Sequence, residues 1–203
     1  MLNRAGALVV AVRGHGEHGA LVRLLTREAG LVGAYVAGAR GRSLRPVLIP
    51  GNRVAAEFTD ALARGGGPTR APSARLELVE SRGPWLTEPL ASAAIGWVTT
   101  LTAAVLPERH PYPALHDALG ATLDAVCHAP SARGWARAVA GYEALVLREL
   151  GYGGRPPPPE LDWEELLARL DRQGAALATH LLAERAGDGM GARAILIDRL
   201  RRI

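Results

Sequence analysis

The hydrophobic and polar positions of this chain follow two different patterns, and the change comes near residue 89. Before it, short apolar runs are separated by groups of Gly, Pro and polar residues, and residues 75–80 alternate between apolar and polar side chains. A period of two is typical of half-buried strands. The runs predicted as strands are 8–12, 20–25, 31–37, 47–49, 53–61 and 75–79. About five short strands joined by close turns indicate a small β-barrel or a sandwich.

After residue 89, apolar residues recur at helical spacing. The predicted helices are 90–106, 113–128, 131–150, 160–186 and 192–202, with a loop at 187–191 between the last two. In the second helix, Leu115, Leu119, Leu123 and Val126 are three or four residues apart and form one apolar stripe. The chain is therefore predicted to be of the α+β class, with its strands first and its helices second.

One helical segment raises the question of a membrane span, because residues 89–107 carry no charge. Hydroxyl side chains and Gly96 interrupt its apolar surface, and a proline stands at each end. A buried core helix is therefore the prediction. No targeting segment is expected, since the apolar run at residues 7–12 is too short for one.

Two domains are predicted, at residues 1–82 and 83–203. The second contains GYGGRPPPP at residues 151–159. Consecutive prolines favour an extended backbone, so residues 154–159 are predicted to form a stiff linker.

Charge is unevenly distributed between these regions. The formal net charge is +4, and all 24 basic residues are Arg. Residues 1–80 contain 11 Arg and 6 acidic residues, whereas the rest of the chain has no basic excess. Arg presents a planar set of donors that suits phosphate groups. A polyanion is therefore expected to bind the N-terminal region, if it binds anywhere.

The basic residues of that region form a candidate phosphate-binding set. The residues predicted to contact nucleic acid are Arg13, Arg23, Arg27, Arg40, Arg42 and Arg45, with Arg53 as a seventh candidate. Only Glu17 and Glu28 oppose them over this stretch. A barrel could place such residues along a groove that follows a phosphate backbone, but a merely solvated surface is the open alternative. Because Tyr35 and Phe58 are the only aromatics nearby, electrostatics should dominate any binding.

A second interpretation comes from Gly14, Gly16 and Gly19, which match the GxGxxG pattern of dinucleotide-binding loops. Arg40 would then be placed to contact the 2′-phosphate of NADP. Against this, Glu17 would lie close to the pyrophosphate, and the helical pattern after residue 89 leaves no further parallel strands. A glycine-rich hairpin turn is the simpler interpretation.

Other chemistry has weaker support. His15, Glu17 and His18 are neighbours in one loop, where side chains seldom converge on one metal ion. Cys127 and His128 are adjacent, so on a helix they point in different directions, and Cys127 is predicted to be a small core side chain. No catalytic constellation is recognisable. The sequence therefore predicts no metal, no cofactor, no small-molecule substrate and no enzymatic activity.

Several segments, in order, carry a family resemblance. They are ALVVAVRGHGEHG (7–19), LLTREAG (24–30), AGAR (37–40), LIPGN (48–52), LPERHPYPAL (106–115) and YEALVLRELGYG (142–153). Each is weak alone, but the ordered set resembles the RecO family of recombination mediators over residues 5–153.

The resemblance implies an N-terminal OB-fold, here a five-stranded β-barrel, followed by an α-helical domain. It implies a non-enzymatic protein of DNA repair that binds single- and double-stranded DNA and anneals complementary strands. It also implies the loading of recombinase together with RecR and single-strand-binding protein, in the cytoplasm at the nucleoid and without a membrane. The family's basic motif after the third strand corresponds to residues 37–42, where its first basic residue is lost, Arg40 is retained and Arg42 is expected to substitute for the second. Residues 14–19 correspond to the first hairpin turn.

Two departures from the family pattern are visible. Many members place zinc-binding cysteines after the Leu-Gly-Tyr-Gly segment, whereas this chain continues with RPPPPELD (155–162) and a shortened insert. Zinc is therefore not expected. Ala140 and Gly141 stand where relatives often carry Arg, which leaves contact with single-strand-binding protein open. A protein–protein adaptor without DNA binding remains a further alternative.

Overall fold

The computed structural model describes residues 4–59, 71–183 and 189–203. Two compact units contain them: residues 1–84 with 106–116, and residues 85–105 with 117–203. The segment 106–116 thus belongs with the N-terminal residues, although it follows the first long helix. Whether a domain that folds independently ends at residue 82 stays a prediction.

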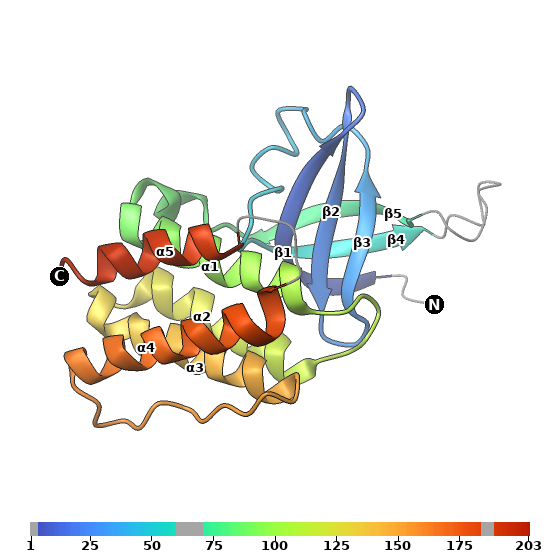
Figure 1. The fold of residues 1–203 in the computed structure, drawn as a ribbon. Helices are drawn as coiled ribbons and strands as arrows, with labels where there is room; N and C mark the ends of the chain where they lie inside the picture. Colours follow the sequence, from blue (N-terminus) through green and yellow to red (C-terminus); the bar gives the residue numbers. More distant parts are fainter. Residues whose placement is uncertain (1–3, 60–70, 184–188) are drawn as a thin grey trace. The chain divides into compact units, whose positions relative to one another are not determined.

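The first unit is a barrel of short strands (Figure 1). Its strands are β1 (Arg4–His15), β2 (Gly19–Thr26), β3 (Gly30–Val36), β4 (Arg53–Thr59) and β5 (Ser73–Glu80). They close in the order β1-β2-β3-β5-β4, with β3 and β5 parallel and the other neighbours antiparallel. Five strands closed in this way are an OB-fold. The predicted α+β class, with an OB-fold barrel before the helices, is confirmed.

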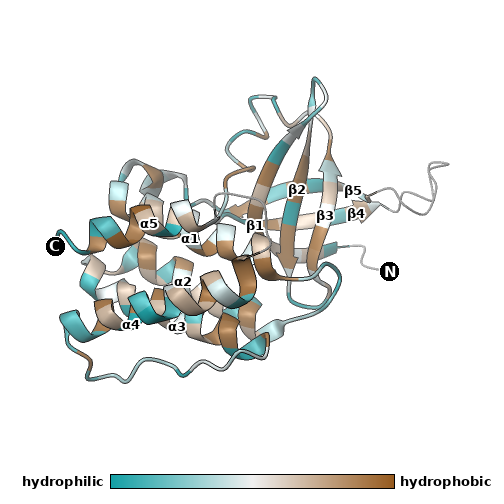
Figure 2. Cartoon of the chain, in the orientation of Figure 1, coloured by the Kyte–Doolittle hydropathy of each residue, from teal (hydrophilic) through white to brown (hydrophobic). Residues whose placement is uncertain are grey.

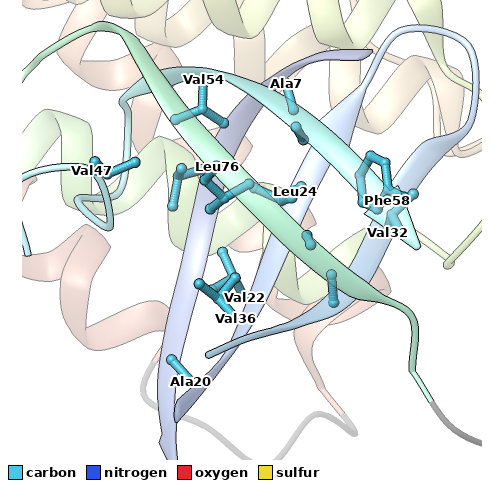
Figure 3. Packing of buried hydrophobic residues seen from close by; sticks show 14 of the residues in the cluster. Ala7, Ala20, Val22, Leu24, Val32, Val36, Val47, Val54, Phe58 and Leu76 are labelled. Atoms are coloured by element: carbon cyan, nitrogen blue, oxygen red, sulfur yellow. The ribbon is translucent and has the colours of Figure 1, made fainter. Parts of the chain in front are cut away.

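Alternation along the strands produces the barrel interior. Figure 3 shows Val22, Leu24, Val36, Val54 and Leu76 directed into one apolar cluster. The residues between them face outward, which is why Figure 2 shows hydrophobic and hydrophilic bands along the same strands. Phe58 also belongs to this core and is 9% exposed. One of the two aromatics considered for contact with bases is therefore a packing residue.

The strand predicted at residues 47–49 is wrong, because these residues lie in a turn and the irregular loop that follows it. Asn52 explains why: its buried side-chain amide donates hydrogen bonds to the carbonyl oxygens of Pro46 (2.8 Å) and Val47 (3.0 Å). Its Oδ1 accepts a hydrogen bond from the Arg82 amide at 2.7 Å. A buried Asn satisfied in this way holds the backbone in a compact loop, while Val47 packs against the barrel core. The turn predicted at residues 64–72 lies mostly outside the described residues.

The segment 106–116 lies against β3. The Arg109 amide donates to the Leu31 carbonyl at 2.8 Å, and Leu31 and Glu108 form a parallel bridge. Gly30 has φ +68°, and a Cβ there would collide with the carbonyl of His110. The REAG turn therefore needs its glycine for the backbone conformation and for this close approach.

The second unit is helical. It contains α1 (Pro89–Val105), most of α2 (Pro113–His128), α3 (Ala132–Glu149), α4 (Trp163–Leu177), the π-helical turn η3 (Ala178–Leu182) and α5 (Gly189–Leu200). The 3-10 turn η2 (Gly83–Thr87) precedes them, and the first residues of η2 and α2 belong to the first unit. In α1, Trp97, Val98 and Leu101 are fully buried, as predicted for a core helix. Within the described ranges, no helix combines the length and apolarity that a membrane crossing requires.

The boundaries of the last helices differ from the prediction. Asp162 caps α4 by accepting a hydrogen bond from the Glu165 amide at 2.8 Å, so the helix begins at Trp163 and not at residue 160. Gly189 to Gly191 already belong to α5, so the loop predicted at 187–191 is wrong for the part that the structure describes. The predicted helix end at residues 184–186 lies outside the described residues.

The proline-rich segment lies along α3. Arg137 donates to the carbonyl oxygens of Pro158 and, at 2.8 Å, of Leu161. Gly154 has φ +139°, and a side chain there would collide with the Ala144 carbonyl. Residues 154–159 therefore connect two helices of one unit and are held to α3 by hydrogen bonds.

A buried polar group lies at the centre of this unit. Glu143 accepts hydrogen bonds from Trp97 Nε1 at 2.7 Å and from Arg193 Nε at 2.9 Å. Burial raises the pKa of Glu143, while the hydrogen bond and the positive charge of Arg193 oppose that rise. Tyr142, the neighbouring residue, shares a hydrogen bond of 2.5 Å with Thr102. These side chains are enclosed and paired, so they belong to the architecture of the unit.

Candidate nucleic-acid interface

The glycine-rich segment 14–19 is a hairpin turn. His15 pairs with Gly19 and Gly14 with Ala20 in an antiparallel ladder, and Gly16 has φ +62°. A dinucleotide-binding loop requires a strand followed by a helix that leads to a parallel strand. The NADP interpretation of this segment is therefore wrong, and the hairpin interpretation is confirmed.

The tip of this hairpin lies beside the loop that follows β3. Figure 1 shows the two together at one end of the barrel, with the β2–β3 turn at the opposite end of the same strands. A hollow of about 220 Å³ lies between the hairpin and this loop. Arg40 and Arg45 line it from the loop, and Gly14 and Gly19 line it from the hairpin. Ala39 and Leu48 anchor this loop in the barrel, so Arg40 and Arg45 are presented from a packed base.

Two more of the predicted residues belong to this end. Arg42 is exposed in the same loop, and Arg13 is exposed on β1, next to Gly14. We call Arg13, Arg40, Arg42 and Arg45 the basic end of the barrel. Four guanidinium groups near one hairpin give a local positive potential that an anionic backbone can use.

Arg23 lies further along β2, on the outer face of the barrel. Its Nη2 is 3.4 Å from Glu108 Oε1, in the segment that lies against β3. Gly33 pairs with Arg23 across the sheet, and a Cβ at Gly33 would be 3.2 Å from Glu108 Oε1. The missing side chain thus leaves room for Glu108 to reach Arg23. A carboxylate competes here with any phosphate.

The remaining candidates do not join the basic end. Arg27 is exposed in the β2–β3 turn, at the other end of the strands. Arg53 Nε is 3.4 Å from Glu80 Oε2. Of the seven candidates, four thus lie at the basic end, Arg23 lies mid-strand, Arg27 lies in the far turn, and Arg53 is paired with Glu80 at the start of β4.

The set predicted to contact nucleic acid did not include His15 and Leu21. On the outer face, Arg13, Leu21 and Tyr35 lie in one row across β1, β2 and β3. Leu21 is 37% exposed, and the imidazole of exposed His15 meets the Tyr35 ring edge-on, with 6.0 Å between centroids. Only the pairing of the strands reveals this row, because its neighbouring members are 8 and 14 residues apart in the chain.

The other candidate chemistry is not supported by geometry. In the part of the chain that the structure describes, no three His, Cys, Asp or Glu side chains gather as a metal site would require. His18 and Glu17 are both strongly exposed, at 3.9 Å from one another. Cys127 is buried near the end of α2, as predicted for a core side chain.

Comparison with known families matches both regions in the same order. The model "Recombination protein O N terminal" matches residues 1–67, and "Recombination protein O C terminal" matches residues 86–155. The first covers β1 to β4 of the barrel and ends before β5, and the second begins just before α1 and ends after α3, at residue 155.

Individual relatives agree with the family models. DNA repair protein RecO of Rhodospirillum centenum is 40% identical over 148 residues, and that of Phenylobacterium zucineum is 37% identical over the same length. The aligned region covers 72% of this chain but only 56% and 58% of those relatives, so the chain spans little more than half of their length. With both family models matched in order and relatives at this level of identity, the chain belongs to the RecO family of DNA repair proteins.

Proposed function

We propose that this chain is a DNA-binding recombination mediator whose OB-fold holds the phosphates of single- and double-stranded DNA at its basic end. The observation that carries the proposal is the hollow of about 220 Å³ that Arg40 and Arg45 line beside the β1–β2 hairpin. Charge-assisted hydrogen bonds from Arg to phosphate are among the stronger polar contacts in proteins.

The shape of the barrel supports this choice of ligand. OB-folds bind oligonucleotides on the face of strands 2 and 3 and on the loop between strands 1 and 2. In this chain, that loop is the hairpin turn at 16–18, and the neighbouring Arg13, Arg40 and Arg45 border it. Contacts made mainly through phosphates predict affinity that depends steeply on salt and weakly on sequence.

The wider activity of the family is part of the same proposal. We expect the chain to anneal complementary strands and to assist recombinase loading with RecR and single-strand-binding protein, without catalysis of its own. The contact with single-strand-binding protein is the least supported of these, because Gly141 stands where relatives often carry Arg and lies against Pro157. Pull-down with purified RecR and with single-strand-binding protein tests each partner separately.

The DNA site is tested by replacing Arg40 and Arg45 together with Ala. Loss of two phosphate contacts should weaken binding to unrelated single-stranded oligonucleotides about equally, by about tenfold at low salt. It should also reduce the slope of log affinity against log salt by about 1 to 2 units. Fluorescence anisotropy at several salt concentrations measures both quantities.

Arg27→Ala removes one positive charge from an exposed turn at the other end of the strands, and the single variant Arg40→Ala is compared with it because it removes one positive charge at the basic end. At about 0.1 M salt, Arg27→Ala should change affinity by less than about twofold, since charges beyond a Debye length of about 10 Å are largely screened. Equal losses in the two single variants, Arg27→Ala and Arg40→Ala, would show that net charge, and not the basic end, governs binding. If the wild-type chain binds no oligonucleotide at low salt, the proposed function itself is wrong.

A further inference from the structure

We propose that Tyr35 and Leu21 form a base-stacking platform on the outer face of the barrel, which makes this site prefer single-stranded over duplex DNA. The inference rests on the proposed function and deepens it. The basic end supplies phosphate contacts that both forms of DNA can use, whereas only a strand with unpaired bases can place a base on an aromatic ring.

The platform follows from the pairing of three strands. Arg13 is opposite Leu21, and Leu21 is opposite Tyr35, so these residues form one row. Their sequence neighbours Val22 and Val36 point into the core, which directs the row outward. Neighbouring strands are about 4.8 Å apart, so Arg13 and Tyr35 are separated by about 10 Å. A short stretch of single strand can span that distance, with a base at Tyr35 and a phosphate at Arg13.

Gly19 determines where the Tyr35 ring lies. A Cβ at residue 19 would collide with the Cζ, Cε2 and Oη atoms of Tyr35, so the phenol end of the ring occupies the space that a side chain would fill. His15 meets the ring edge-on at an interplanar angle of 81°. The ring is thus held in place before any ligand arrives, which lowers the entropy lost on binding.

Gly19 also connects the platform to the phosphate site. It lies in the wall of the hollow that Arg40 and Arg45 line. One residue of β2 therefore borders both the aromatic ring and two guanidinium groups. On its other side, Tyr35 lines a second hollow of about 500 Å³, which Ser73 and Arg75 also border. Charge, an aromatic ring and open space occur together here.

The composition of the strands makes Tyr35 the natural candidate. Among the five strands, the aromatic residues are Tyr35 and Phe58, and Phe58 is in the barrel core. Leu21 lies opposite Tyr35 and is 37% exposed. A shift of the strand register by one residue would have turned its side chain into the core. An exposed Leu beside a Tyr and several Arg residues can contact the apolar face of a base, and this contact would remove its apolar surface from water.

Tyr35→Ala tests the platform, with Tyr35→Phe as its conservative partner. The Ala variant should lose about tenfold in affinity for an oligothymidine strand, because one stacked base is removed, and less than about twofold for a duplex of the same length. The Phe variant keeps the ring and should behave as the wild type with both. An oligonucleotide with abasic sites keeps the phosphates, so wild type and Tyr35→Ala should bind it equally.

Direct contact is read from the unaltered protein, so the test does not depend on a variant that folds. An oligonucleotide with 5-iododeoxyuridine, irradiated in complex with the wild-type chain, should crosslink to the tryptic peptide that contains Tyr35. Crosslinks confined to other peptides would overturn the proposal.

The two proposals fail in distinguishable ways. If Arg40→Ala/Arg45→Ala weakens binding while Tyr35→Ala lowers single-strand and duplex affinity by the same factor, only the platform is wrong. If Tyr35→Phe loses as much as Tyr35→Ala, the phenol oxygen and not stacking is responsible, and the platform is again wrong.

Discussion

The two units of this chain use arginine in opposite ways. In the helical unit, Arg193 is 5% exposed and its guanidinium is 2.9 Å and 3.0 Å from the two carboxylate oxygens of Glu143. In the barrel, Arg13, Arg40, Arg42 and Arg45 are all exposed around one hairpin. A buried ion pair cannot be offered to a ligand without opening the fold, whereas an exposed guanidinium costs little to redirect.

Net charge alone would miss this difference. The barrel region has the basic excess, but Arg82 in that unit is fully buried and bound to Glu80 at 2.8 Å. Conversely, Arg201 in the helical unit is exposed yet paired with Asp171 at 2.8 Å. The comparison therefore teaches that the partners and burial of each Arg, rather than the number of Arg residues, separate a binding surface from a structural network.

The largest expected effect comes from breaking the buried pair. Glu143→Ala leaves the Arg193 guanidinium and Trp97 Nε1 without their buried acceptor. An uncompensated buried charge should lower the free energy of unfolding by about 3–5 kcal/mol. Urea unfolding followed by tryptophan fluorescence and circular dichroism measures this loss.

The matched control replaces both partners, as Glu143→Met/Arg193→Met. Removing two charges together avoids the unpaired cation, so the double variant should be more stable than Glu143→Ala. A loss below about 1 kcal/mol for Glu143→Ala would show that this region is loosely packed or hydrated. The contrast between the two units would then be much weaker.

A smaller effect should appear at alkaline pH. Burial raises the pKa of Tyr142 well above its ordinary value of 10.0, against the opposing effect of its hydrogen bond to Thr102. Above pH 10 the unfolded chain loses this proton and the folded chain keeps it. The contribution of Tyr142 to the free energy of unfolding is therefore fully present below pH 10 and is lost as pH rises. The expected loss is about 1.4 kcal/mol for each pH unit.

Tyr142→Phe isolates this contribution. The variant should be about 1 kcal/mol less stable at pH 7, because it lacks the hydrogen bond with Thr102, but its stability should fall less steeply between pH 10 and pH 12. Tyr152→Phe, which alters a ring that is 49% exposed, should fall as steeply as the wild type. Identical alkaline slopes for wild type and Tyr142→Phe would contradict the prediction.

Sequence patterns predicted most elements because local rules and tertiary packing agree there. Leu115, Leu119 and Leu123 are buried on one stripe of α2, and five of the six predicted strand runs lie in the barrel. The run at 47–49 failed because a short apolar stretch does not distinguish a strand from a loop that packs inward. The hydrogen bonds of Asn52 stabilise the loop rather than a strand. Asn52 lies outside the run at 47–49, and one of its partners is the distant Arg82.

The candidate site was only partly accessible from sequence. The count of basic residues included all four residues of the basic end, but it also included Arg27. Separation along the sequence does not show that Arg27, which follows β2, lies at the other end of the strands from the hairpin. Tyr35 was noted as one of two aromatics, and only burial separates it from Phe58. The outer-face row depends on cross-strand register, and a shift by one residue would reverse which side chains point outward.

The smallest expected effect tests whether a carboxylate in the barrel unit weakens binding at the proposed DNA site. Glu108→Gln should release Arg23 from its 3.4 Å ion pair, in the outer-face position next to the row of Tyr35. Because such exposed pairs contribute little, affinity for single-stranded DNA should rise only about twofold at low salt, with no change at high salt.

Glu77→Gln is the matched control, since it removes the same charge from another 3.4 Å pair, with Arg4. An equal gain in both variants would mean that overall charge is responsible, whereas a gain that disappears when Arg23→Ala is added to Glu108→Gln would place the competition at Arg23.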